Sequence, residues 1–107
     1  MPFIKPLPEG GFYAVIFSNT KSNDLEGYAE MDEKTLDLAQ KQPGFLGYES
    51  LTKEKETIFI SYWEIKEAIN NWRNNSVHQM AKANALKWYK RYLSQICFVE
   101  RSILFEN

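Results

Sequence analysis

An α+β fold is the class of structure that this sequence predicts, and three observations carry the prediction. Runs rich in aromatic and β-branched residues, which are typical of strands, occur near both ends of the chain and in its middle. Two of these runs flank a short polar turn, which indicates an antiparallel hairpin. Stretches with helical periodicity separate this hairpin from the first run and from the last.

The first half of the chain predicts an arm, a strand and a helix. Residues 1–11 contain three of the four prolines and form an extended N-terminal arm. The run FYAVIFS predicts a strand over Phe12–Ser18, followed by a polar turn, NTKSN, that offers a helix N-cap. Apolar residues at helical spacing predict a helix over Leu25–Gln40, which Pro43-Gly44 ends.

The second half predicts the hairpin, two helices and a last strand. The hairpin strands are Phe45–Thr52 and Thr57–Trp63, and a short helix follows over Lys66–Arg73. A longer helix is expected from Val77 to about Gln95, and a final strand over Ile96–Phe105.

This order is the β-α-β-β-α-β pattern of the ferredoxin-like fold, with a four-stranded antiparallel sheet. The whole pattern fits in one domain over residues 12–106, since 107 residues is an ordinary domain length.

Both faces of the predicted sheet carry large apolar side chains. The residues Phe12–Phe17 are all apolar or aromatic, and aromatic residues make up 15% of the chain. Helices can cover only one face of such a sheet, and a strand facing water should alternate apolar with polar residues. We therefore expect a second copy to cover the other face in a two-fold homodimer.

Composition excludes several kinds of partner and site. The formal charge of -1 predicts no nucleic-acid binding, and no apolar run approaches the roughly 20 residues that span a bilayer. The single cysteine, Cys97, and an N-terminus without an apolar signal segment predict a cytoplasmic location. His78 is the only histidine, which excludes a multi-histidine metal site within one chain.

Two titratable residues on the predicted helices are candidates for chemistry. His78 falls on the apolar half of its helix, where it is either a hydrogen-bonded buried side chain or a ligand contact, a general base or a haem ligand. Asp32 falls within the apolar stripe of the first helix, one turn after Tyr28. It is either a boundary carboxylate or a buried base with a raised pKa.

Four aromatic residues are candidates for a pocket wall, because a planar aromatic ligand needs faces to stack against. They are Trp63, Trp72, Trp88 and Tyr89. An aromatic stripe at such spacing is equally a feature of hydrophobic cores, so the sequence leaves both readings open.

Four segments together resemble the antibiotic biosynthesis monooxygenase (ABM) domain family of the dimeric α+β barrel superfamily. The resemblance extends from about Phe12 to Phe105. The segments are QPGFLGYES (Gln42–Ser50), ISYWEIKEAINNW (Ile60–Trp72), VHQMAK (Val77–Lys82) and WYKRYLSQICFVER (Trp88–Arg101).

The resemblance implies more than one activity. Some members of the family are cofactor-independent monooxygenases that oxidise polycyclic phenols to quinones. Related members bind and cleave haem with an Asn on the first strand, a Trp on the middle helix and a His ten residues after that Trp. Trp72 is similar to the helix Trp, but the predicted first strand has no Asn, and Lys82 stands at the histidine position. Haem is therefore disfavoured, and no cofactor is expected.

Three hypotheses follow for function. The first is a cofactor-free monooxygenase for a small aromatic or phenolic substrate, with His78 or Asp32 as the base and the four aromatic residues as the pocket wall. The second is a haem-binding or haem-degrading protein. The third is a non-catalytic dimer that binds a small ligand, as in a stress response.

Overall fold

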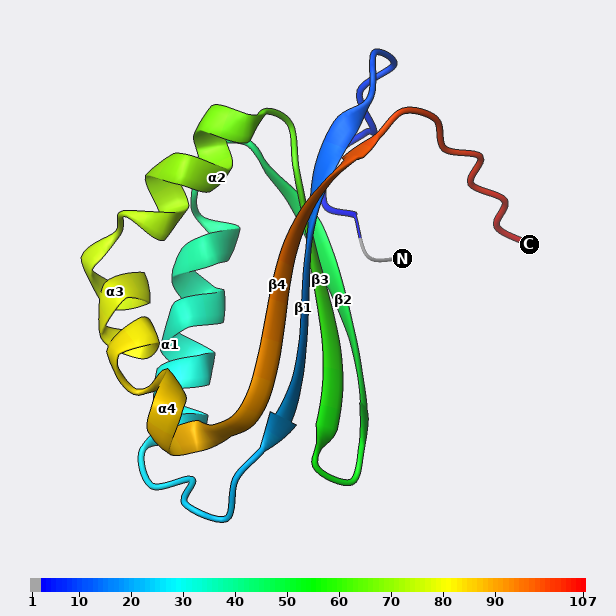
Figure 1. Cartoon of the computed structure of the whole chain (residues 1–107). Coiled ribbons are helices and arrows are strands. Elements are labelled where there is room, and N and C mark those ends of the chain that lie inside the picture. The colour runs from blue at the N-terminus through cyan, green and yellow to red at the C-terminus, as the bar shows by residue number, and fades with distance from the viewer. Residues whose placement is uncertain (1–2) are drawn as a thin grey trace.

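The fold is a four-stranded sheet with helices on one side, described here from a computed structural model (Figure 1). The structure describes residues 3–107, except for the side chains of Ser76, Val77, His78 and Ala81. The elements in chain order are β1 (Phe12–Lys21), α1 (Tyr28–Gln40), β2 (Phe45–Lys53), β3 (Glu56–Trp63), α2 (Lys66–Arg73), α3 (Ser76–Ala83), α4 (Ala85–Trp88) and β4 (Tyr89–Val99). The predicted α+β class and ferredoxin-like order are confirmed.

The sheet has the strand order β2-β3-β1-β4, and all neighbouring strands are antiparallel. The four helices lie on one face of this sheet, and the C-terminal segment after β4 lies toward the other face (Figure 1). Opposed residues on neighbouring strands share a face of the sheet. The helix-facing side therefore carries the row Trp63, Tyr13 and Phe98, and the opposite side, the open face, carries Tyr62, Ala14 and Cys97.

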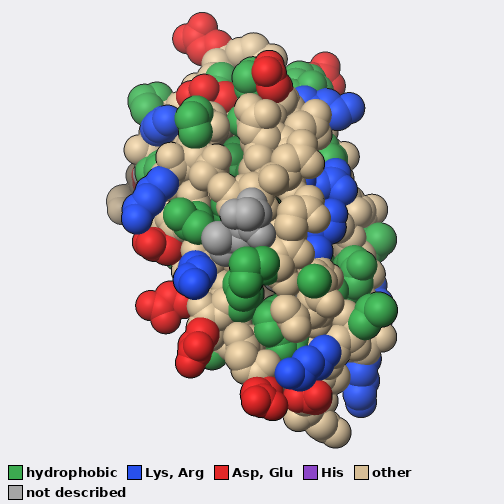
Figure 2. Space-filling model, turned by 90° about the vertical axis from the view of Figure 1, so that its left-hand side faces the viewer, with side chains coloured by type: hydrophobic (Ala, Val, Ile, Leu, Met, Phe, Trp, Pro, Cys, Tyr) green, Lys and Arg blue, Asp and Glu red, His purple; other side chains and the backbone are tan. Residues whose placement is uncertain are grey.

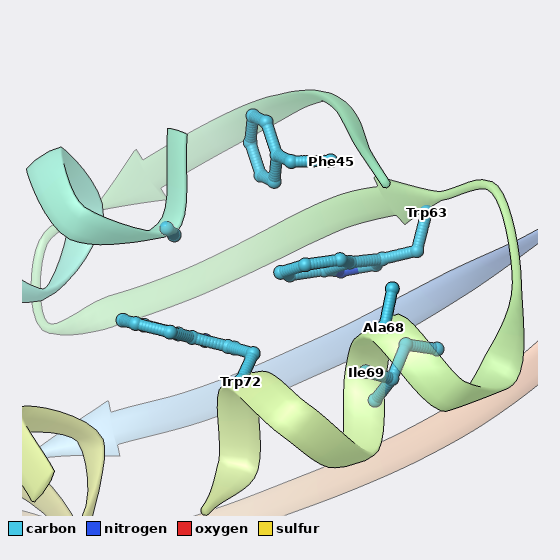
Figure 3. Close-up of a cluster of buried hydrophobic side chains, with 6 residues drawn as sticks. Phe45, Trp63, Ala68, Ile69 and Trp72 are labelled. Atoms are coloured by element: carbon cyan, nitrogen blue, oxygen red, sulfur yellow. The ribbon is translucent and has the colours of Figure 1, made fainter. Parts of the chain in front are cut away.

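A cluster of aromatic and aliphatic side chains fixes the helix layer on the sheet. Figure 3 shows the Trp63 indole with Phe45 on one side and with residues of α2 on the other. The rings of Phe45 and Trp63 meet edge to face, with their centroids 5.2 Å apart. The buried members of this core cluster are Ala39, Phe45, Trp63, Ala68, Ile69 and Trp72. Burial of side chains of this size stabilises the fold by about 1.5–3 kcal/mol each.

The predicted long helix over Val77–Gln95 is wrong. The chain forms the short helices α3 and α4 and then turns into a strand at Tyr89. The segment from Tyr89 contains good helix formers, but β4 pairs with β1 along the whole length of β1. These non-local hydrogen bonds outweigh the local helical preference. The predicted last strand, Ile96–Phe105, is displaced for the same reason, since β4 ends at Val99.

Two further boundaries differ from the prediction. β1 runs on to Lys21, so the predicted polar turn at residues 19–23 begins as strand, paired with both neighbouring strands. Helix α1 starts at Tyr28 and not at Leu25. Its N-cap is Gly27, at φ 80°, and no side chain caps it. The bounds predicted for α2, Lys66–Arg73, are confirmed.

The N-terminal arm covers one end of the open face. Phe3 forms an isolated antiparallel bridge with Gly47, and the Ile4 amide donates to the Leu46 carbonyl at 2.7 Å. The Phe3 ring lies 4.8 Å from the ring of Tyr62 and 6.1 Å from that of Phe12, centroid to centroid. Arm residues 3–11, the part that the structure describes, leave the other end of the open face exposed, as at Leu51 and Ile58.

The outer surface of the helix layer is mixed in character. Figure 2 shows hydrophobic side chains scattered among charged side chains of both signs on this face. Within the part of the chain that the structure describes, no helix is long and apolar enough to cross a membrane.

Gly44 joins α1 to β2 at a point where only glycine fits. Its φ is +87°, and a Cβ there would lie 2.7 Å from the Ala68 Cβ in the core cluster. We expect Gly44→Ala to lower the free energy of unfolding by about 1–3 kcal/mol, through backbone strain and displacement of α2. Gly10→Ala is the matched control, since its Cβ would meet nothing within 4 Å. Urea unfolding followed by tryptophan fluorescence measures both, and equal stability of the two variants would contradict the prediction.

Candidate active site

Four titratable side chains come together between helix α1 and the sheet, and we call this group the tyrosine site. It consists of Lys21 of β1, Tyr28 and Asp32 of α1, and Tyr89 of β4. Tyr28 and Asp32 are four residues apart and therefore lie on the same side of α1. Lys21 and Tyr89 are paired across β1 and β4, so they lie side by side on the helix-facing side.

The ammonium group of Lys21 is held by polar groups of the sheet. Its Nζ donates to Thr57 Oγ1 at 2.7 Å and to Asn19 Oδ1 at 3.4 Å. It also lies 5.4 Å from the centroid of the Tyr28 ring, within cation–π range. Burial lowers the pKa of Lys21, and the negative charge of Asp32 partly opposes this shift. The position of the cation is therefore fixed before any ligand arrives.

The carboxyl group of Asp32 is poised to take a proton. Asp32 retains a solvent-exposed surface, but the partial burial of its carboxyl raises its pKa above the ordinary value, and the charge of Lys21 opposes the rise. The ion pair of Lys41 and Asp37, at 3.3 Å, is the one direct salt bridge among the residues described, so Lys21 and Asp32 interact without touching. A carboxylate with a raised pKa is a better proton acceptor than an ordinary one.

The two tyrosines of the site are neutral at physiological pH. Burial raises the pKa of Tyr28, and the charge of Asp32 raises it further. The pKa of Tyr89 lies far above its usual range, first because of burial and then because of Tyr28, with which it shares a side-chain hydrogen bond. One of the two hydroxyl groups donates to the other in this bond, so one O–H is left to donate a hydrogen bond to an oxygen of a ligand.

Aromatic rings extend from the tyrosine site along the helix-facing side of β1 and β4. The centroid of the Phe17 ring lies 5.4 Å from that of Tyr89 and 5.8 Å from that of Tyr92, and the rings of Tyr13 and Phe98 are 5.2 Å apart. The helices leave much of this surface uncovered, since Tyr92 is 51% exposed and Phe98 is 55% exposed. Flat aromatic surface of this kind can stack against a planar ligand.

The structure separates the predicted site residues into two groups. Asp32 and Tyr89 lie together in the tyrosine site. Trp63 and Trp72 belong to the core cluster. Trp88 packs against Tyr28 of α1, and its indole N–H donates at 2.9 Å to the carbonyl of Glu26, which precedes α1. The pocket-wall role of these four aromatic residues stays a prediction.

His78 belongs to helix α3, but its side chain lies outside the described part of the structure. Its predicted role as a base therefore also stays a prediction.

Sequence reasoning missed Lys21 and gave Tyr28 no functional role. The signal for Lys21 is the period of two that continues along β1 through Val15, Phe17 and Asn19, all on the helix-facing side. The signal for Tyr28 is its spacing of one helical turn from Asp32. Residues 19–23 are polar and typical of a turn, which hides the continuation of the strand to Lys21 in the sequence.

The residues do not fit the haem pattern. The first strand does contain an asparagine, contrary to the prediction, because β1 extends to Lys21 and includes Asn19. This residue is buried on the helix-facing side. However, Trp72 is buried in the core cluster, and Lys82, which replaces the histidine of the pattern, is exposed. An ammonium group is a poor ligand for iron, so we derive no step through haem. Among the side chains described, no three of His, Cys, Asp or Glu gather as a metal site would require.

Comparisons with known proteins agree with this fold. The model of the family described as antibiotic biosynthesis monooxygenase matches residues 12–84. The uncharacterized protein YqjZ of Bacillus subtilis is 43% identical over 109 residues, covering 100% of this chain and 96% of that protein. A structure of SnoaB, a cofactor-independent oxygenase from Streptomyces nogalater, has a TM-score of 0.73 at 10% identity and covers 86% of this chain and 96% of its own. PA3566 from Pseudomonas aeruginosa has a TM-score of 0.72 at 12% identity, covering 90% and 99% of the two chains.

The fold and the position of the tyrosine site define an α+β domain with a polar site between helices and sheet. The chain belongs to the antibiotic biosynthesis monooxygenase family. The structural likenesses are at low identity and concern the fold alone.

The raised pKa of Asp32 predicts a specific pH dependence of stability. The folded protein holds the Asp32 proton to a higher pH than the unfolded chain, whose value is near 3.8. Stability from this group is therefore complete below about pH 3.8 and decreases as the pH rises through the folded pKa. Asp32→Asn removes the ionisation, so we expect it to raise Tm at pH 7 and to lose that advantage below pH 4.

Thermal unfolding between pH 3 and pH 8 measures this effect. Glu33→Gln, at an exposed position of the same helix, controls for the loss of one negative charge. A lower Tm for Asp32→Asn at pH 7 would contradict the prediction.

Proposed function

We propose that this protein is a cofactor-independent monooxygenase that oxidises a small phenolic substrate with O2. The observation that carries the proposal is the grouping of the Asp32 carboxyl with the Lys21 ammonium, which Thr57 holds, at one end of an uncovered aromatic surface. Membership of the antibiotic biosynthesis monooxygenase family supports the reaction class. The likeness in fold to SnoaB, a cofactor-independent oxygenase, is consistent with it.

Asp32 is the base in this proposal. The substrate hydroxyl lies between the Asp32 carboxylate and the Lys21 ammonium. Asp32 removes the hydroxyl proton, and Lys21 stabilises the oxyanion that remains. Both side chains are partly desolvated, which strengthens their interaction with a developing charge relative to water. Of the hydrogen-bonded pair Tyr28 and Tyr89, the O–H that is not used between them can donate to the same oxyanion.

The reaction then needs only the substrate and O2. Ionisation places negative charge on ring carbons of the phenolate, and one electron passes from it to O2. The resulting superoxide and phenoxyl radical combine to form a C–O bond at a ring carbon. Loss of the proton on that carbon and cleavage of the O–O bond leave a second carbonyl. The products are a quinone and water, and the proton held by Asp32 goes to the departing oxygen.

The aromatic surface accounts for the class of substrate. Tyr89, Phe17 and Tyr92 form a contiguous set of rings next to Asp32 and Lys21. A planar substrate stacked on these rings would place a hydroxyl at its edge within reach of the charged pair. Aromatic pairs of this kind contribute about 0.5–1.5 kcal/mol beyond area burial.

We also propose that the protein acts as a homodimer through the open face of the sheet. Three aliphatic side chains at the end away from the arm are exposed: Leu51 by 82%, Ile58 by 53% and Leu93 by 44%. Pairing places all three on the open face, next to Ile16 and Ile60. A contiguous apolar surface of this kind is buried in most soluble proteins, and a second copy of the same face covers it symmetrically.

Oxygen consumption tests the oxygenase proposal. With a panel of one- to three-ring phenols, we expect substrate-dependent O2 uptake with quinone formation by the metal-free protein. Asp32→Asn should lower kcat by about 10²- to 10⁴-fold, as expected for loss of a general base. The acid limb of the wild-type pH profile should lie above the ordinary range of an aspartate, because only the deprotonated carboxyl acts. This limb should be absent in Asp32→Asn.

His78→Gln is the parallel variant, because it removes the other candidate base. If it, and not Asp32→Asn, removes activity, His78 is the base and the assignment to Asp32 is wrong. Tight binding of a phenol with no O2 uptake would overturn the enzymatic proposal in favour of a ligand-binding protein.

Light scattering coupled to gel filtration tests the dimer. We expect the wild type to elute with the mass of two chains and Ile58→Lys to elute with the mass of one, since burial of a charge in an apolar interface is unfavourable. Leu86→Lys is the control, because Leu86 is 90% exposed on α4, on the helix side. A dimeric Ile58→Lys variant would exclude this face as the interface.

A further inference from the structure

Thr35 of helix α1 has a buried hydroxyl group without a hydrogen-bond partner. Its Oγ1 is the one buried side-chain oxygen or nitrogen in this condition among the residues described. The other three threonines are bonded: Thr52 and Thr57 pair at 2.9 Å, and Thr20 donates to Glu56 at 3.2 Å. Buried polar groups in folded proteins nearly always have partners, so this hydroxyl requires an explanation.

The position of Thr35 connects it with the tyrosine site. At about 100° per residue, Thr35 lies within about 20° of Tyr28 around the helix and about 60° from Asp32. It is three residues beyond Asp32, which is about 4.5 Å further along the axis. Ala39, one turn later on the same stripe, is buried in the core cluster. The hydroxyl of Thr35 thus lies on the stripe that carries the tyrosine site, between that site and the core.

A structural role does not account for this hydroxyl. A threonine inside a helix commonly donates to the carbonyl four residues earlier, but Thr35 Oγ1 makes no such bond. Valine has nearly the same shape and would fill the same space without an unsatisfied polar atom. No group of the protein satisfies this hydroxyl, and Thr35 lies next to the tyrosine site on the same stripe of α1.

We propose that Thr35 determines specificity by donating a hydrogen bond to a second oxygen atom of the substrate. This inference rests on the proposed function, in which the first oxygen lies between Lys21 and Asp32. The separation of the two contacts along α1 selects a phenol whose second oxygen is on another ring carbon, as in a dihydroxyarene or a hydroxyaryl ketone. A phenol with a single oxygen leaves the Thr35 hydroxyl unsatisfied and binds more weakly.

Anaerobic calorimetry tests this inference, because binding is measured without turnover. The probes are 1-naphthol, with one oxygen, and naphthalene-1,3-diol and naphthalene-1,5-diol, each with two. We expect the wild type to bind at least one diol more tightly than 1-naphthol. Thr35→Val should weaken binding of that diol by about five- to tenfold, the usual effect of one hydrogen bond, and change the affinity for 1-naphthol by less than about twofold.

Two controls separate recognition from folding. Thr35→Ser retains the hydroxyl and should retain the preference for the diol. Thr35→Val should have a Tm equal to or above that of the wild type, because it removes a polar group that has no partner in the protein. A lower Tm for Thr35→Val would indicate a structural role and overturn the inference.

The remaining outcomes also decide between the proposals. Equal loss of affinity for 1-naphthol and the diols, or no loss at all, would overturn the role of Thr35 while leaving the oxygenase proposal in place. Selective loss for a diol, in a protein that consumes no O2 with any phenol, would support Thr35 and overturn the oxygenase proposal. If neither 1-naphthol nor a diol binds, both are wrong.

Discussion

The packing of Trp63 against Phe45 and the residues of α2 is the contact on which the rest of the structure depends. It joins the helix layer to the sheet through strands β2 and β3, with α2 on β3 and α1 on β2. Because this anchor is at one side of a four-stranded sheet, the helix-facing rings of β1 and β4 are covered only in part. The aromatic surface from Phe98 to Tyr92 is exposed as a direct result. Firm packing on one half of the sheet and an accessible surface on the other therefore have a single cause.

The tyrosine site lies at the boundary between these two halves, and this position determines its electrostatics. Full burial would make two unpaired charges too unfavourable, and full exposure would leave their pKa values unshifted. Partial burial raises the pKa of Asp32 and lowers that of Lys21, while their mutual attraction opposes both shifts. The sheet holds Lys21 through Thr57 and Asn19, so the cation does not need to collapse onto the carboxylate. The open face instead carries exposed aliphatic side chains, which suit contact with another protein surface.

The fold was predictable from the sequence to a greater extent than the site. The hairpin, the bounds of α2 and the order of elements along the chain from β1 through α1 to β2 follow from local patterns, and the structure agrees. The prediction of a long helix is wrong because the spacing of aromatic residues after Tyr89 is compatible with both a helix and a strand. Pairing with β1 decides in favour of the strand. The predicted end of the first strand is wrong for a similar reason, because Asn19 and Lys21 are polar residues typical of turns. Asp32 was recognised as a candidate, since a carboxylate in an apolar stripe is a local anomaly.

The sequence by itself determined the class of fold, the apolar character of both sheet faces and the presence of a carboxylate on the inner stripe of the first helix. These properties are set by periodicity and composition within short segments. The tertiary structure decided which groups meet: Lys21 and Tyr89 from opposite ends of the chain, beside Tyr28 and Asp32. It also decided that Trp63 and Trp72 are core residues and that the Thr35 hydroxyl is buried without a partner. Such pairings depend on contacts between segments distant in sequence, and no local pattern encodes their geometry.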